Sequence, residues 1–174
     1  MIDAIRKRRS IRAYLKRAVE PAKLSQVLLA AFFAPSSWGL RPWEFVVIKD
    51  EKAKMALSQS TVHARFVKDA PIVVAICYDM KKGKRFKEDS SIAAAHMMLE
   101  AGNQGLGTCF VQVADAGDPP GIAEPHVKEV LDIPDSYRVQ CMVTLGYPKR
   151  ALTGHKDSEY DEGKVHFDSF SKRR

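Results

Sequence analysis

The sequence predicts an α+β fold in which helices pack on a central mixed or antiparallel sheet. Two helical patterns precede the first strand-like run, and the later elements alternate without the strict β–α–β rhythm of a parallel sheet. The 174 residues, of which 45% are hydrophobic, are enough for one domain with a buried core. We therefore expect a single domain over residues 1–174.

The N-terminal part carries the clearest helix signals. Residues 2–9 have a short helical pattern, and a second helix is expected from Pro21, because proline suits the first helical position. That helix must end before Pro35, since the residue preceding a proline is excluded from the α conformation. A strand is then expected over residues 44–49 and a surface helix over residues 50–60.

The C-terminal part contains the buried elements. An apolar, β-branched run over residues 72–78 predicts a buried strand, and the basic residues 81–87 predict a loop. The longest helix is expected from Asp89 to about Gln104. It is apolar on most of its circumference, so a second subunit could contribute to its burial. The remaining elements are a strand at 108–113, a short helix at 123–131 and a strand at 139–145.

The glycines at positions 102, 105 and 107 resemble a phosphate-binding loop only in spacing. A dinucleotide fingerprint follows a strand and opens a helix, whereas these glycines close a helix and precede a strand. We interpret them as a helix stop. No separate nicotinamide-binding domain is expected.

The net charge of +7 raises the question of a nucleic-acid or membrane partner. The basic runs at 6–9, 81–85 and 172–174 are of a length typical of solvated faces or tails. Aromatic and charged residues coincide chiefly at 36–45, which disfavours nucleic-acid binding. An anionic cofactor or substrate is the other sufficient explanation.

The cysteines and the hydropathy of the sequence indicate in which cellular compartment we expect the protein. Cys77, Cys109 and Cys141 are widely spaced and form no CxxC pair, so free thiols in a reducing cytoplasm are expected. No apolar run approaches the ~20 residues that cross a bilayer. The charged N-terminus is not followed by an apolar segment, so neither a secretory signal nor a membrane partner is expected.

Conventional catalytic sets are missing from the sequence. The five histidines are scattered, and neither a metal-binding His spacing nor a Gly-x-Ser-x-Gly elbow occurs. Binding features without an acid–base or nucleophile set are typical of an enzyme whose cofactor supplies the reactivity. No metal site is expected.

The most informative segment is residues 8–12. Arg8, Ser10 and Arg12 alternate along the chain, so an extended backbone would point all three to one side, where guanidinium forks suit phosphate oxygens. The alternative is a solvated basic helix end, because cations are favoured at helix C-termini.

The loop at 34–43 is the second informative segment. It is polar and turn-rich, yet it carries Trp38, Trp43 and Arg41, and loops of this kind usually bind a ligand. Tryptophan can cover a flat ring. The alternative is that Trp43 simply fills the core beside the following strand.

Taken together, these motifs resemble the FMN-dependent nitroreductase family. The resemblance covers nearly the whole chain in the right order, and the first two motifs at their separation are quite specific. The motifs are residues 8–14, 34–37 with 41–45, 69–71, 105–109 and 145–148. The resemblance implies a nitroreductase-like α+β fold that forms an intertwined homodimer, with residues from about 150 to 174 as an arm packing on the partner subunit.

The resemblance also implies which residues bind FMN. Arg8 and Ser10 would hold the phosphate and ribityl chain, and Arg12 would lie towards the pyrimidine edge. Arg9 belongs to the same motif and contacts either cofactor or solvent. The full implied set is Arg8, Arg9, Ser10, Arg12, Pro35, Ser36, Ser37, Gly39, His63 and Lys156. Pro35, Ser36 and Ser37 would come from the other subunit.

The sequence departs from the family pattern near the substrate. The family often has Asn at the position of Gly39, Gln at that of Arg41 and Asn at that of His63, which could instead be an ordinary surface histidine. Three basic residues in the C-terminal part of the chain are candidates for a contact with the FMN phosphate: Lys149, Arg150 and Lys156. We favour Lys156.

The activity implied is that of an NAD(P)H-driven oxidoreductase. NADH or NADPH would give a hydride to flavin N5, and a nitroaromatic, quinone or similar small molecule would then take the same site. Alternatives are a flavin-binding protein without NAD(P)H turnover, which stores or senses FMN, and a family member with flavin-breakdown or dehalogenase activity. The latter usually need an added lid segment, for which the chain has little room.

Overall fold

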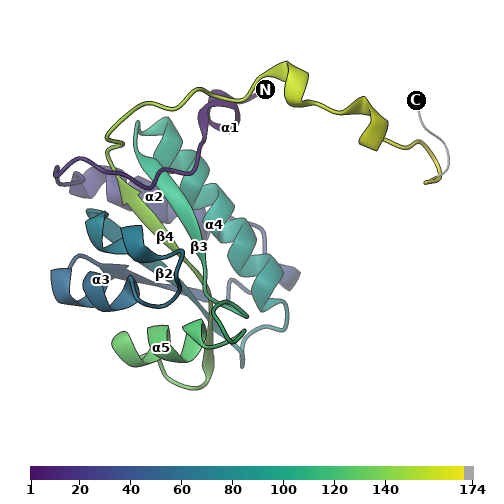
Figure 1. Cartoon of the computed structure of the whole chain (residues 1–174). Coiled ribbons are helices and arrows are strands. Elements are labelled where there is room, and N and C mark those ends of the chain that lie inside the picture. The colour runs from purple at the N-terminus through teal and green to yellow at the C-terminus, as the bar shows by residue number, and fades with distance from the viewer. Residues whose placement is uncertain (171–174) are drawn as a thin grey trace.

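The centre of the molecule is one four-stranded antiparallel sheet, shown in Figure 1. The computed structural model describes residues 1–170, so the basic run at 172–174 lies outside the described residues. The strands run in the spatial order β1-β2-β4-β3. Their bounds are β1 Trp43–Ile48, β2 Ile72–Asp79, β3 Gly107–Gln112 and β4 Tyr137–Gly146.

Side chains of the two central strands alternate between two hydrophobic cores, as the period of a strand requires. Val74 and Ile76 of β2 face the core that contains Met97, whereas Val73 and Ala75 face the opposite core. All the β2 residues are buried. The apolar run predicted from the sequence is therefore a strand covered on both faces.

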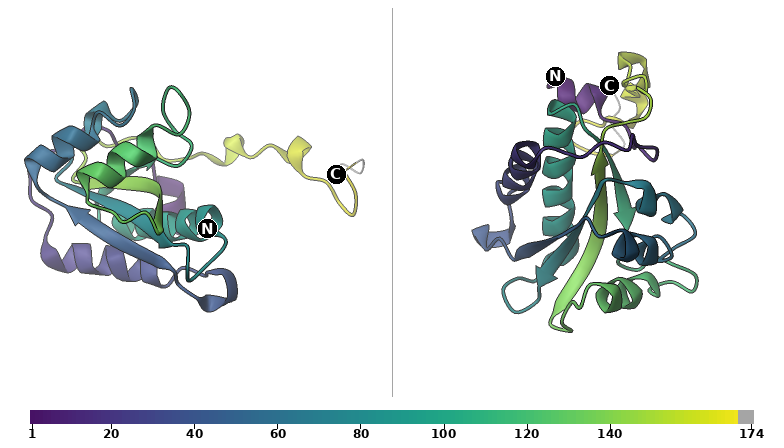
Figure 2. Two further views of the ribbon diagram at one scale, coloured as in Figure 1. Left: turned by 90° about the horizontal axis from the view of Figure 1, so that it is seen from below. Right: turned by 90° about the vertical axis from the view of Figure 1, so that its left-hand side faces the viewer.

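Helices cover both faces of the sheet, and Figure 2 shows the two layers on either side. The helices α2 (Pro21–Phe32) and α4 (Phe86–Asn103) pack on one face. The helices α3 (Glu51–Leu57) and α5 (Ala123–Val130) pack on the other. The predicted α+β arrangement is confirmed.

Several helix boundaries follow from local chemistry. The helix α2 begins at Pro21 and stops before Pro35, as predicted. Asp50 precedes α3 and accepts a hydrogen bond from the Ala53 backbone at 2.8 Å, which caps the first turn. The first helix, α1 (Asp3–Lys7), is shorter than the predicted 2–9, because the chain from residue 8 onward is extended beside β3.

The start of α4 differs from the prediction. The loop expected at 81–87 ends early, since the helix begins at Phe86 and not at Asp89. Asp89 lies in the first turn, and its carboxylate accepts from the Ser37 backbone N–H at 2.9 Å and the Tyr78 hydroxyl at 3.0 Å. An acidic residue near a helix start thus serves a tertiary contact here and does not cap the helix.

The chain beyond β4 leaves the body of the molecule. Figure 1 shows the C-terminal segment running away from the sheet as an extended arm. Its only helical turns are two 3-10 segments, Asp157–Glu159 and Glu162–Lys164, in the part that the structure describes. The His155 N–H donates to the Arg6 carbonyl at 2.8 Å, which ties the base of the arm to α1.

Within residues 1–170, no helix has the length and apolar character required to cross a membrane. The same residues contain no group of three or more metal-binding side chains placed to hold an ion. Cys77, Cys109 and Cys141 are buried free thiols.

Candidate functional site

The extended segment after α1 forms an extra edge beside β3. Ser10 pairs in parallel with Thr108, and the Ile11 N–H donates to the Thr108 carbonyl at 2.8 Å. Ile11 is buried against Gly107, where an added Cβ would lie 2.6 Å from the Ile11 Cγ1. Gly107 therefore allows the close approach, and the residues on either side of Ile11 face away from it.

The pKa of the Cys109 thiol on β3 is influenced by polar side chains of this N-terminal segment. Burial raises the pKa of Cys109, while the Arg12 charge, hydrogen bonding with the Ser10 hydroxyl and the Arg8 charge act in the opposite direction. The structure places Ser10 and Arg12 together in the lining of one small cavity, whereas Arg8 lines another.

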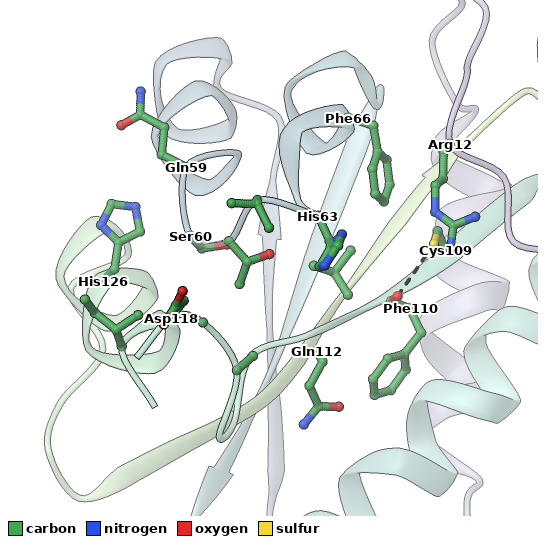
Figure 3. A pocket seen from close by; sticks show the side chains of 16 residues that line it. Arg12, Gln59, Ser60, His63, Phe66, Cys109, Phe110, Gln112, Asp118 and His126 are labelled. Carbon is green, nitrogen blue, oxygen red and sulfur yellow. Dashed lines mark hydrogen bonds between the residues drawn. The ribbon is translucent and has the colours of Figure 1, made fainter. Parts of the chain in front are cut away.

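A cavity of about 950 Å³, which we call the main cavity, opens beside β3. Figure 3 shows Arg12, Phe66 and Phe110 towards one end and Gln59, Asp118 and His126 towards the other. Its walls come from the N-terminal segment, residues 59–66, β3, residues 116–122 and α5. Segments far apart in the sequence thus build one hollow with aromatic and polar walls.

Arg12 and His63 both line the main cavity. The Arg12 guanidinium carbon lies 5.8 Å from the centre of the Phe66 ring, an arrangement that favours a fixed cation over an aromatic face. His63 lines the same cavity, and Figure 3 shows it between Ser60 and Phe66. The histidine singled out from the sequence is therefore brought to the predicted cofactor residue.

Ser60 also lines this cavity. The residue is 5% exposed, and its buried Oγ has no hydrogen-bond partner among the residues that the structure describes.

Arg150 joins the cationic end of the site. It lines a small cavity of about 310 Å³ together with Ser10 and Arg12, and a second one of about 230 Å³ that also contains Arg8 and Arg9. Lys156, which the sequence favoured for this role, is exposed on the arm, where its N–H donates to Glu159. The structure brings Arg150 to the motif and does not bring Lys156 there.

The loop after α2 lies at the far end of α4. Ser37 is hydrogen-bonded to Asp89 near the start of the helix, whereas Arg8 and Arg9 line a cavity with Gly102 near its end. At 1.5 Å per residue the two positions on the helix are roughly 20 Å apart. Pro35, Ser36, Ser37 and Gly39 are thus not brought to Arg12 within one chain.

The backbone of this loop adopts a conformation that most residues avoid. Trp38, Gly39 and Arg41 have φ values of 55°, 68° and 48°. The Arg41 N–H donates to the Ser36 Oγ at 2.9 Å, and the Ser37 N–H and hydroxyl contact Asp89 at 2.9 and 3.2 Å. These contacts hold the strained turn in place.

The two tryptophans have different environments. Trp38 is 76% exposed, whereas Trp43 is 2% exposed and fills the core beside β1. The core-filling alternative for Trp43 is therefore the one observed.

Comparison with known proteins identifies the family. The profile described as "Nitroreductase family" matches residues 5–62 and 56–147, most of the chain. The chain belongs to the nitroreductase family. The resemblance seen in the sequence motifs is confirmed.

Three similar proteins illustrate the range of nitroreductase relatives. A structure from Clostridium difficile, named an FMN-dependent nitroreductase, is 40% identical, has a TM-score of 0.92 and matches 98% of this chain and 100% of its own. A protein of Thermus thermophilus named NADH dehydrogenase is 30% identical over 82% of this chain and 83% of its own length. The NADPH:FMN oxidoreductase of Vibrio harveyi shares the fold, with a TM-score of 0.82 and 21% identity. The match covers 99% of this chain and 77% of the Vibrio harveyi chain.

Part of this nitroreductase site has no signal in the sequence. Ser60, Phe66, Asp118 and His126 line the main cavity but form no motif or periodic pattern. They line one cavity only because α3, α5 and the segments next to them pack on the same face of the sheet. From the sequence, the residues around Gly117 and Asp118 are predicted only to form a loop.

Proposed function

We propose that this chain is an FMN-dependent oxidoreductase that uses NADH or NADPH to reduce a small molecule such as a nitroaromatic or a quinone. The observation that carries the proposal is the position of Arg12, which lines the main cavity beside Phe66 and also lines a small cavity with Ser10 and Arg150. Arg150 lines a further small cavity with Arg8. The named activity of the Clostridium difficile relative supports it.

The residues of the site fit FMN. Guanidinium groups and a hydroxyl suit a phosphate, and the main cavity has a volume typical of ligand sites, on the order of 300–1,000 Å³. Phe66 and Phe110 offer apolar contact to a flat ring, while His63 offers a hydrogen bond to its polar edge. Arg8, Ser10 and Arg150 would hold the phosphate end, and Arg12 the pyrimidine end.

The protein contributes binding and electrostatics. FMN, when bound, would supply the redox chemistry, which is hydride transfer between the nicotinamide and the acceptor. Arg12 places a permanent positive charge beside the cavity, where it stabilises negative charge. No side chain is required to donate a proton, since the cavity can admit solvent.

A homodimer completes the site in this proposal. Pro35, Ser36, Ser37 and Gly39 lie roughly 20 Å along α4 from the cations, so their expected contacts with FMN require a second subunit. We infer that the domain spans the chain and that its arm, with Lys156, packs on the partner. The three free thiols fit a reducing cytoplasm.

The deciding experiment is the visible spectrum of the purified protein, repeated without oxygen after adding NADH or NADPH. Flavin bands that bleach support the oxidoreductase. Bound flavin that stays oxidised with both donors would instead support a storage or sensing protein. A colourless protein that does not bind added FMN would contradict the cofactor assignment.

A further inference from the structure

A strongly basic hollow, here called the basic groove, has a volume of about 890 Å³. It is lined by residues 12–18, by α3 and by residues 68–71. Arg12 lines both the groove and the main cavity, so the two hollows share this residue.

A buried ammonium forms the floor of the groove. Lys54 is 3% exposed, and its Nζ donates to the Ala70 carbonyl and to the Glu51 carboxylate, both at 2.8 Å. An ammonium carries three N–H donors, so one remains for a ligand. A buried cation of this kind favours an anion beside it.

The rim carries further cations that have no counter-ion within the chain. Arg12, Lys16, Lys68 and Lys149 line the groove, and none has a carboxylate within 4.0 Å among residues 1–170. Besides Glu51, the groove contains only one carboxylate, that of Asp69.

Backbone pairing fixes part of this rim. The Lys149 N–H donates to the Ala13 carbonyl, and the Leu15 N–H donates to the Tyr147 carbonyl, both at 2.9 Å. The two segments that carry Lys16 and Lys149 are thereby held together. The positive charge of the rim is thus carried by segments that backbone hydrogen bonds hold in place.

We propose that the basic groove binds the phosphate-bearing tail of the hydride donor and makes NADPH the preferred donor. This inference rests on the proposed function, because it assumes that the nicotinamide end occupies the main cavity. The 2′-phosphate adds about two negative charges that NADH lacks. The four groove cations without a carboxylate partner among residues 1–170 therefore distinguish the two donors by charge: Arg12, Lys16, Lys68 and Lys149.

The test is calorimetric titration of the flavin-loaded protein with NADP⁺ and with NAD⁺, followed by initial rates with NADPH and NADH. We expect NADP⁺ to bind at least about tenfold more tightly. Lys68→Gln and Lys149→Gln should each weaken NADP⁺ binding roughly tenfold and NAD⁺ binding less. The control is Lys52→Gln, which removes an exposed charge from α3 outside the groove and should change neither affinity.

Equal affinities, tighter NAD⁺ binding, no binding of either nucleotide, or equal losses for both in the two groove variants would overturn the proposal. The calorimetry is independent of turnover. If neither NADPH nor NADH reduces the flavin, the proposed function is contradicted. The relative affinities for NADP⁺ and NAD⁺ would still test whether the groove binds the phosphate-bearing tail.

Discussion

Arg12 is the residue on which the hollows of this surface converge. Its side chain lines the main cavity, the basic groove and the small cavity that contains Arg150. It is exposed, so its position depends on the neighbouring Ile11, which is buried and hydrogen-bonded to β3. Replacing the exposed side chain should therefore alter ligand binding without disturbing the core.

We predict that Arg12→Ala weakens FMN binding by about 1.5–3 kcal/mol, roughly 10- to 150-fold, because a charge-assisted hydrogen bond is lost. Fluorescence titration of the flavin-free protein with FMN measures this. Arg65→Ala is the control, since Arg65 is exposed and lines neither the main cavity nor the basic groove. An unchanged FMN affinity in Arg12→Ala would remove Arg12 from the site.

Glu20 and Tyr147 predict an acid-dependent contribution to stability. The Tyr147 hydroxyl donates to Glu20 at 2.6 Å and, with the backbone of Glu20 and Arg17, lowers the pKa of that carboxyl to about 2 from 4.5. A carboxyl whose pKa is lower in the folded state stabilises the fold above its unfolded pKa. That contribution is lost as the pH falls from 4.5 towards 2.

Tyr147→Phe should therefore be less stable than the wild type above pH 5, and the difference should shrink between pH 4.5 and 2. Urea unfolding at pH 7, 4 and 2.5 measures it. Tyr160→Phe, which alters an exposed tyrosine of the arm, is the control. A difference of the same size at pH 7 and at pH 2.5 would show that Glu20 ionisation is not involved.

At the scale of elements, α4 connects the two halves of the site. Its first turn holds the loop after α2 through Asp89, and its last turn packs beside the N-terminal segment that carries Arg8. Asp89 is 3% exposed and uses both carboxylate oxygens on protein donors. The strained turn at Trp38 thus depends on one buried carboxylate.

Asp89→Ala should destabilise the fold by about 2–3 kcal/mol, because it leaves the Ser37 N–H and the Tyr78 hydroxyl without their shared acceptor. It should also loosen the loop that carries Ser36 and Ser37. Tyr78→Phe is the comparison: it removes the bond to Asp89 and the acceptor of the Arg85 backbone N–H, costs about 1–2 kcal/mol and leaves the Ser37 contact intact.

Chemical denaturation measures the stability of both variants, and proteolytic cleavage at the loop measures its order. Faster cleavage in Asp89→Ala than in Tyr78→Phe is the expected pattern. Equal cleavage rates in both variants would contradict a role of Asp89 in holding the loop.

At the scale of the whole molecule, several large apolar side chains are exposed in the chain that the structure describes. Those on α2, on the loop after it, on α4 and on the arm include Leu29, Phe33, Trp38, Ile92 and Phe167. Exposed apolar surface of this kind marks an interaction site, and under our proposal a second copy of the chain covers it.

We predict that the wild-type protein sediments with the mass of two chains, and that Ile92→Glu shifts it to a single folded chain. Because Pro35–Gly39 of a partner would then be missing, the variant should hold FMN at least about tenfold more weakly. Sedimentation, circular dichroism and FMN titration measure the three effects.

Met80→Glu is the control, since Met80 is exposed in the connection between β2 and α4. It should remain a dimer with full FMN content. A wild-type protein that is monomeric and binds FMN tightly would contradict the divided site.

Local sequence signals were sufficient for the elements. Pro21 and Pro35 bound α2, and the apolar run at 72–78 became the buried strand β2. The motif at residues 8–12 pointed to an anion site because alternation along an extended segment is a local property. The start of α4 was placed wrongly, since Asp89 serves a contact with Ser37 that is distant in the sequence.

The sequence by itself determined the family and the order of the elements, and it singled out the basic motif at residues 8–12, because these depend on neighbouring residues. Only the tertiary structure decided that Arg150 joins Arg12, that Ser60 and His126 line one cavity, and that the loop at Ser37 lies at the other end of α4. The packing of helices on a sheet brings distant segments together, and no local pattern records which of them will meet.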